Sequence, residues 1–146
     1  MLEYYSKNAT VTLAAANQET VVPFNTRSLQ KGKSVVMSGN SADINCCGVY
    51  NVNVGACFSA GTVADITFRF YVDNVAQPQA ERTVSAATVD DFYTVDFSTY
   101  VTKQDNNCNC NPCTAPTNVY VTVSASVADV ALTFETTDIQ VYKATR

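Results

Sequence analysis

The side chains of this sequence that are best suited to chemistry are its six cysteines. Cys108, Cys110 and Cys113 fall within the stretch NCNCNPC, and Cys46 and Cys47 are adjacent. A Cys-x-Cys-x-x-Cys spacing can place thiolates around a zinc ion, or it can form disulfides that hold a long loop in place. The same thiols can also stay free. Which of these chemistries is available depends on where the fold places the five residues.

Alternation of apolar and polar residues with a period of two recurs along the chain and predicts β-strands. The clearest run is GVYNVNVGACFSA, in which every second residue from Tyr50 to Phe58 is apolar. Only residues 12–20 could form a helix, and that stretch is too short to decide the fold. The pattern predicts an all-β sandwich or jelly roll, with a short lead or first strand over 1–16 and one domain over 17–146. The other alternating runs are 62–73, 91–102, 118–128 and 131–144.

The composition excludes several classes of function. Hydrophobic residues make up 47% of the chain and charged residues 15%, as expected of a folded domain. The net charge is −4 and the nine Lys and Arg residues are scattered. We therefore expect no nucleic-acid binding, which requires a clustered basic surface. No apolar run approaches the roughly 18–20 residues that span a bilayer, so we expect no membrane insertion.

An enzymatic role is also not expected. The chain has no histidine, which removes Ser-His-Asp and Cys-His catalysis and the most common general base near neutral pH. Calcium-binding, phosphate-binding and dinucleotide-binding motifs are absent from the sequence. A redox pair of Cys110 and Cys113 is disfavoured, because that chemistry requires a helix N-terminus and Pro112 lies in a loop before a strand. We expect a protein that binds rather than catalyses.

The order of the runs and turns resembles a known family. The segments VPFNT, KGKSVVMSG, INCCGVYNVNVGACFSA and VADITFRFYVDNVAQPQA resemble the C1q/TNF-like jelly-roll family, over roughly Val21 to Lys143. The resemblance is closest to small C1q-like proteins of phages and prophages of gut bacteria and to the C-terminal knobs of bacterial collagen-like proteins. The chain differs from animal C1q heads because it has no collagen-like Gly-X-Y stem. Its cysteine-rich segment is also outside the family pattern.

The resemblance implies about ten strands in two antiparallel sheets, assembled as a tight homotrimer. We expect a non-enzymatic structural or adhesion protein of a phage or prophage virion, such as a head fibre or decoration knob, that binds a capsid protein or a host-surface partner. The alternative is a secreted or surface lectin-like module that binds glycan, with Tyr100, Tyr120 and Tyr142 available to stack on sugars. Residues 1–13 lack the features of a secretory signal. We therefore expect the protein in the virion or in the bacterial cytoplasm before release, with an extracellular location possible afterwards.

One strand face is the predicted trimer interface. Tyr120, Thr122, Ser124 and Ser126 alternate with apolar residues, so they share the face that points away from the core. In the resembling family this late strand lies near the three-fold axis. An uncharged, weakly polar face with one aromatic residue suits a subunit interface, where charge is depleted and Tyr is enriched. An ordinary solvated Ser/Thr face is the alternative.

The strand order of the resembling family brings five cysteines together. Cys46 and Cys47 precede the strand 48–58, and three further traverses return the chain to the same end before the NCNCNPC loop. Cys57 then lies near the opposite end, away from the core. Because histidine is absent, a structural zinc would need thiolates alone, or the Asp105 carboxylate as its fourth ligand. We favour disulfides from the loop to Cys46 and Cys47, contributing about 2–4 kcal/mol, over zinc or free thiols, because two separated Cys-x-x-Cys pairs are missing.

Overall fold

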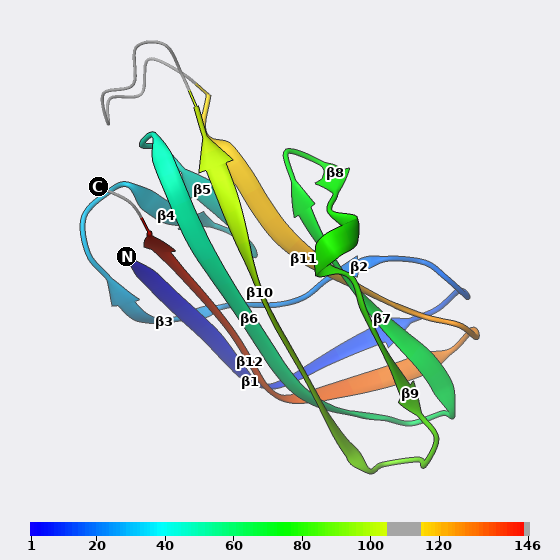
Figure 1. Ribbon diagram of the computed structural model, residues 1–146. Helices are drawn as coiled ribbons and strands as arrows, with labels where there is room; N and C mark the ends of the chain where they lie inside the picture. Colours follow the sequence, from blue (N-terminus) through cyan, green and yellow to red (C-terminus); the bar gives the residue numbers. More distant parts are fainter. Residues whose placement is uncertain (105–114, 145–146) are drawn as a thin grey trace.

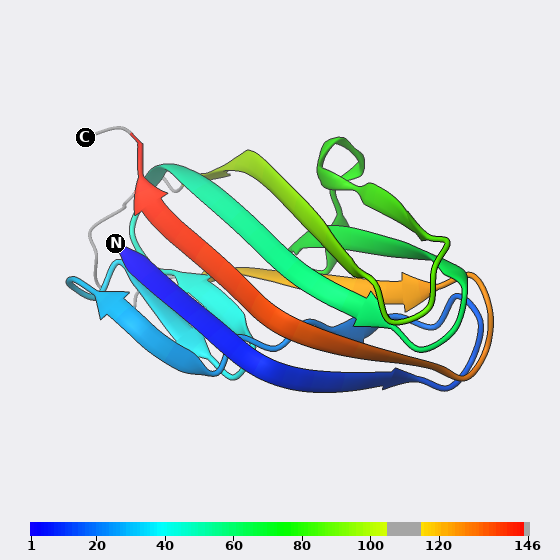
Figure 2. The same cartoon turned by 90° about the horizontal axis from the view of Figure 1, so that it is seen from below.

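The computed structural model describes residues 1–104 and 115–144 (Figure 1). Two antiparallel sheets pack against each other as a sandwich, as Figures 1 and 2 show. The described residues form twelve strands and one short 3₁₀ helix, Pro78–Ala80. The strands are β1 (Leu2–Leu13), β2 (Thr20–Val21), β3 (Thr26–Gln30), β4 (Val35–Ser38), β5 (Ser41–Ile44), β6 (Gly48–Ala60), β7 (Ala64–Val72), β8 (Val75–Ala76), β9 (Arg82–Ala86), β10 (Phe92–Lys103), β11 (Thr117–Ala125) and β12 (Val130–Lys143).

The five-stranded sheet, called sheet A below, has the order β10-β6-β12-β1-β3. The other, sheet B, has the order β4-β5-β11-β7-β8, with β2 also paired to β11 and β9 also paired to β7. Neighbours in each sheet are antiparallel. Strands adjacent in the sheets are often distant in the sequence, as with β1 and β12. The predicted all-β, two-sheet sandwich is therefore confirmed.

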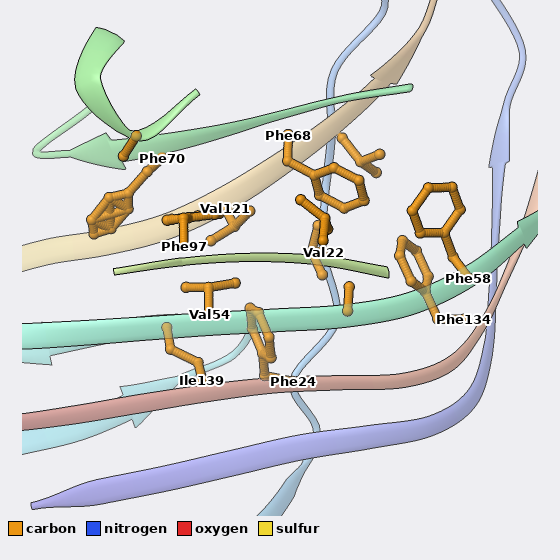
Figure 3. Packing of buried hydrophobic residues seen from close by; sticks show 14 of the residues in the cluster. Val22, Phe24, Val54, Phe58, Phe68, Phe70, Phe97, Val121, Phe134 and Ile139 are labelled. Carbon is orange, nitrogen blue, oxygen red and sulfur yellow. The ribbon is translucent and has the colours of Figure 1, made fainter. Parts of the chain in front are cut away.

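The core lies between the sheets and follows the predicted alternation. In β6 the apolar residues of the even-numbered set point inward, and Tyr50, Val52 and Phe58 are fully buried. Phe58 of sheet A packs against Phe68 of sheet B, with ring centroids 5.4 Å apart, and against Phe134 at 6.1 Å (Figure 3). Tilted aromatic contacts at this separation add to the free energy gained by burying apolar area.

Local sequence also determines the tight turn after β7. Asp73 and Asn74 both have positive φ, 49° and 66°. Asn and Asp tolerate this left-handed conformation better than other non-glycine residues, and two such residues in a row suit a two-residue hairpin turn. The turn joins β7 to β8, where Val72 pairs with Val75.

Three details differ from, or extend, the sequence prediction. Residues 2–13 form a long strand inside sheet A, between β12 and β3. The stretch 12–20 is not helical, because Thr12 and Leu13 complete β1 and Thr20 begins β2. The strand predicted over 118–128 ends three residues earlier in the structure. Strand β11 ends at Ala125, and Val127 is exposed.

Candidate binding and assembly surfaces

The outward face of β11 carries the residues predicted to form the trimer interface. The inward residues Val119, Val121 and Val123 are fully buried in the core, so the alternate residues point to the other side of sheet B. Within the single chain, Thr122 is already only 5% exposed and Ser124 only 3% exposed. Ser126 lies just beyond the end of the strand. The structure therefore places Tyr120, Thr122 and Ser124 on one face, but other side chains of the chain cover most of it.

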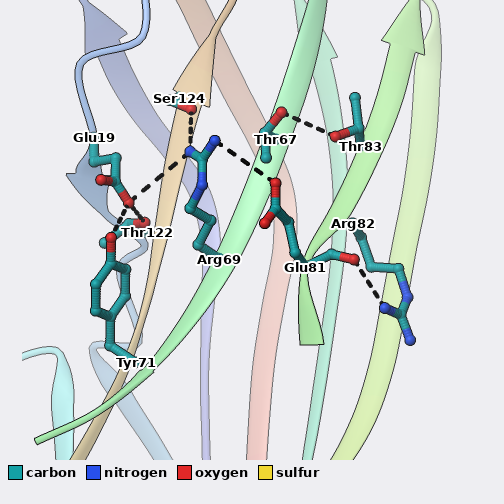
Figure 4. Close-up of polar contacts among 9 residues, drawn as sticks. All are labelled: Glu19, Thr67, Arg69, Tyr71, Glu81, Arg82, Thr83, Thr122 and Ser124. Carbon is teal, nitrogen blue, oxygen red and sulfur yellow. Dashed lines mark hydrogen bonds and ion pairs between the residues drawn. The ribbon is translucent and has the colours of Figure 1, made fainter. Parts of the chain in front are cut away.

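A polar network across β11 and β7 provides this cover (Figure 4). The Glu19 carboxylate accepts hydrogen bonds from Thr122 Oγ1 and from the Tyr71 hydroxyl, each at 2.6 Å. The Arg69 guanidinium donates to Ser124 Oγ at 3.0 Å and lies 3.7 Å from the Glu81 carboxylate. The network joins the loop before β2 to both central strands of sheet B.

The pKa values in this network follow from its contacts. Burial by itself would raise the pKa of Glu19, but the hydrogen bonds from Thr122 and Tyr71 and the charge of Arg69 outweigh it, so the pKa lies below its ordinary value. The hydrogen bond to Glu19, followed by burial, raises the pKa of Tyr71. Glu19 is therefore ionised at neutral pH, and the face predicted to be uncharged in fact contains three charged side chains. The assignment of the trimer interface to this face stays a prediction, although its premise is weakened.

The outer face of sheet A has a different character. The outward residues of β6 are uncharged along the whole strand: Val49, Asn51, Asn53, Gly55, Cys57 and Ser59. Asn51 is only 7% exposed in the single chain, and Ser98 Oγ of the adjacent β10 donates a hydrogen bond to Asn53 Oδ1 at 2.6 Å. At the same end of the face Tyr100 of β10 is 66% exposed. Because β6 lies inside sheet A, this uncharged row runs through the interior of the face.

A shallow hollow of about 510 Å³ lies over Gly55 in this face. Asp96 and Asp138 pair with Gly55 from the strands on either side, and both line the hollow. A Cβ atom added at Gly55 would lie 2.6 Å from Asp138 Oδ1. Asp138 can occupy this position because glycine has no side chain. Neither carboxylate forms an ion pair with any residue in the described part of the chain.

The surroundings of Asp138 disfavour the charged form of its carboxyl group. Its burial, followed by the nearby negative charges of Glu3 and Asp96, raises the pKa of the carboxyl above its ordinary value of 3.8. Between pH 3.8 and the raised pKa of the folded state, the folded chain keeps a proton on Asp138 that the unfolded chain releases. The free energy of unfolding therefore falls as pH rises through that range, and above it the charged Asp138 destabilises the fold.

We expect the Asp138→Asn variant to be more stable than the wild type at pH 7. Because the side chain is partly exposed, solvent screens much of the effect, and a rise in Tm of at most about 3 °C is expected, equivalent to roughly 1 kcal/mol. The gain should disappear as pH falls below 3.8, where the wild-type carboxyl is protonated in both states. Thermal unfolding followed by circular dichroism between pH 3 and 8 measures this. The exposed Asp91→Asn change is the matched control, and an equal gain from both variants would contradict the explanation.

The predicted cysteine cluster is only partly within the described residues. Cys46 is buried, and neither Cys46 nor Cys47 is a free thiol. Lys103 pairs with Gly48 and Thr117 pairs with Ile44, so the described residues on both sides of 105–114 lie at the same end as Cys46 and Cys47. Cys108, Cys110, Cys113 and Asp105 lie outside the described residues. The choice of disulfides over a structural zinc therefore stays a prediction.

Cys57 is placed as predicted, on the outer face of sheet A and apart from the other described cysteines. It is a free thiol, and its Sγ donates to the Glu135 carboxylate at 3.6 Å. Burial, the hydrogen bond to Glu135 and the charge of Glu135 all raise the pKa of the thiol. Because the thiolate is the reactive form, Cys57 is expected to react slowly at neutral pH.

We expect two disulfides, one from Cys46 and one from Cys47, each to the NCNCNPC loop. Intact mass measures them. Reduction of the native, metal-free protein should raise its mass by about 4 Da, since each bridge accounts for about 2 Da. The Cys57→Ser variant should show the same rise, because Cys57 is outside the cluster. Under gentle ionisation, the mass of one bound zinc together with no change on reduction would contradict the disulfide prediction and establish the metal site.

The described residues contain neither a metal-ion cluster nor a helix that could cross a membrane. No group of three or more Cys, Asp or Glu side chains there is arranged to hold a metal ion. No helix in residues 1–104 and 115–144 has the length and apolar character needed to cross a membrane.

No family model and no curated protein matches the chain, but solved structures do. Eiger TNF from S. frugiperda is similar over 99% of this chain and 92% of its own, with a TM-score of 0.62 and 10% identity. The globular domain of the zebrafish complement 1qA protein is similar over 99% and 97%, with a TM-score of 0.56 and 11% identity. The PRD1 vertex protein P5 is similar over 99% and 96%, with a TM-score of 0.56 and 11% identity.

These similarities identify the fold. The chain has the two-sheet jelly roll that TNF and C1q domains share, and the similarity extends over nearly the whole of each chain. The low identities show the fold alone, because unrelated functions occur on one fold.

Proposed function

We propose that the chain is a non-enzymatic binding knob that assembles as a homotrimer and serves as a phage or prophage virion component, either a head fibre or a decoration knob. The observation that carries the trimer is the uncharged outer row of β6, in the interior of sheet A. Interfaces are depleted in charge and enriched in Tyr, and exposed Tyr100 and Tyr142 lie on the same face. We propose the interface on this face, and the β11 face with Tyr120, Thr122, Ser124 and Ser126 stays the alternative.

Three arguments support a role in adhesion within a virion. The fold is shared with a vertex protein, the PRD1 vertex protein P5, and with C1q and TNF domains. The chain has no histidine, which disfavours the commonest general acid–base catalysis. A trimer presents three copies of every loop in one direction, so weak single contacts to a capsid protein or host surface combine into avid binding.

Light scattering of the purified protein at micromolar concentration tests the assembly, and three times 15.8 kDa is the expected mass. A stable monomer would contradict the trimer. Mass spectrometry of density-purified particles from the source culture tests the virion assignment. Recovery of the chain in the cell-surface or secreted fraction alone, with none in particles, would instead favour the alternative of a lectin-like module.

A further inference from the structure

A second hollow, of about 330 Å³, lies on the outer face of sheet B. Its lining residues are Val21 of β2, Asn40 and Ser41 at the β4–β5 turn, and Asn118 and Tyr120 of β11. Along one edge of β11, β5 pairs with residues 117–119 and β2 with residues 122–123. The hollow lies beside the gap between those two pairings. This volume is at the lower end of ligand pockets, about 300–1,000 Å³, and suits one small ring rather than a long chain.

Tyr120 supplies a rigid aromatic wall. Its ring stacks on the ring of Tyr71, with centroids 5.0 Å apart and an interplanar angle of 3°. Its hydroxyl donates to Asn74 Oδ1 at 2.9 Å. Tyr71 lies on β7, whereas the hollow lies on the β5 and β2 side of β11. One ring face of Tyr120 is thus covered by Tyr71, and the opposite face borders the hollow.

Asn118 contributes a fixed hydrogen-bond acceptor. Its side-chain nitrogen donates to Ser41 Oγ at 2.9 Å and to Asp43 Oδ1 at 2.7 Å, which uses both amide protons. The side-chain carbonyl oxygen has no hydrogen-bond partner among residues 1–104 and 115–144. The two contacts therefore hold the amide in one orientation and leave its acceptor end for a ligand.

Asn40 contributes the complementary donor. Its side-chain oxygen accepts a hydrogen bond from the Phe24 backbone N–H at 3.1 Å. Its NH₂ group forms no hydrogen bond within the described part of the chain, so two protons remain for a ligand. The hollow therefore combines a donor, an acceptor, the face of an aromatic ring and the apolar side chain of Val21, which is 39% exposed.

We propose that this hollow binds one neutral pyranose ring of a glycan. The apolar C–H face of a sugar packs on an aromatic ring, and its hydroxyls both donate and accept hydrogen bonds, as the ends of Asn40 and Asn118 require. No Lys or Arg lines the hollow, and a carboxylate, that of Asp43, accepts a hydrogen bond from the lining residue Asn118. An anionic ligand is therefore disfavoured. The sugar would be a ligand for the proposed adhesion function. Only the biological role of the site rests on that function, because one chain supplies the whole site.

Saturation-transfer NMR with the methyl glycosides of glucose, galactose, mannose and N-acetylglucosamine tests the proposal. At least one of these sugars should bind the wild type with a Kd in the millimolar range, as expected for one small ring on a shallow site. Tyr120→Ala should weaken binding at least tenfold. Tyr120→Phe, which also loses the bond to Asn74 but keeps the ring, should retain it within about threefold. Val63→Ala, in the exposed connection between β6 and β7, is the control and should bind like the wild type.

The results separate this proposal from the proposed function. Absence of signal from all four sugars would overturn the glycan site, as would equal binding by Tyr120→Ala and the wild type. Circular dichroism and light scattering on the same samples report folding and assembly. A trimer without sugar binding would leave the proposed function standing, whereas sugar binding by a monomer would retain the site and contradict the trimer.

Discussion

Replacement of Phe58 by alanine is expected to lower the free energy of unfolding by about 3–5 kcal/mol. Phe58 is fully buried and lies within 6.1 Å of three aromatic rings, those of Phe68, Tyr93 and Phe134. Phe68 belongs to sheet B, so the truncated side chain would leave a cavity between the two sheets. Domains of this size are stable by only about 5–15 kcal/mol, and the variant should be close to unfolding at 37 °C.

Urea denaturation at one fixed protein concentration measures this effect, because the stability of an oligomer depends on concentration. Phe58→Leu keeps most of the apolar volume and should lose only about 1–2 kcal/mol. Val75→Ala, at an exposed position of the short strand β8, should change stability by less than about 0.5 kcal/mol. A loss below about 1 kcal/mol for Phe58→Ala would show that the two sheets do not depend on this contact.

Introduction of a carboxylate at Asn53 is expected to dissociate the proposed trimer. Asn53 lies in the uncharged outer row of β6 and borders the hollow that already contains Asp96 and Asp138. A Glu here would add a third carboxylate beside Asp96 and Asp138 in each of three subunits. Removal of this further unpaired charge from water opposes association by several kcal/mol per ion. At micromolar concentration and pH 7 the mass should fall from three times 15.8 kDa to 15.8 kDa.

Two controls give this experiment its specificity. Asn53→Gln has the same size as Asn53→Glu without the charge, and it should remain trimeric. Ser126→Glu places the same charge just beyond the end of β11, at an exposed residue of the interface that the sequence suggested. Dissociation by Ser126→Glu but not by Asn53→Glu would move the interface to β11. Acidification below pH 4 should restore association of Asn53→Glu, because the new carboxyl becomes neutral.

The strands were predictable because one face of each is buried. In β6 and β10 the period of two matches the observed burial almost residue by residue, since the sandwich core receives every second side chain. The turn at Asp73 and Asn74 was predictable for a local reason, because these residue types tolerate positive φ. The separation of Cys57 from Cys46 and Cys47 followed from the strand order.

The surfaces were less predictable than the core. The alternation in β11 correctly indicated that Thr122 and Ser124 point away from the core. It could not indicate that Glu19, more than 100 residues earlier, accepts a hydrogen bond from Thr122. Gly55 offered a sequence signal for the hollow on sheet A, because a glycine inside a long strand often marks a close approach. No feature of the sequence indicated how the side-chain amides of Asn40 and Asn118 are oriented.

The sequence by itself determined the fold class and the inward face of each long strand of this protein, because burial repeats with the geometry of the strand itself. Only the tertiary structure decided which outward residues are available to a partner. Three contacts between distant segments determine this. The hydrogen bond from Thr122 to Glu19 covers the outer face of β11, and the approach of Asp138 to Gly55 forms the hollow on sheet A. The hydrogen bond from Asn118 to Ser41 orients an amide that lines the second hollow. Contacts over such sequence distances leave no periodic pattern in the chain.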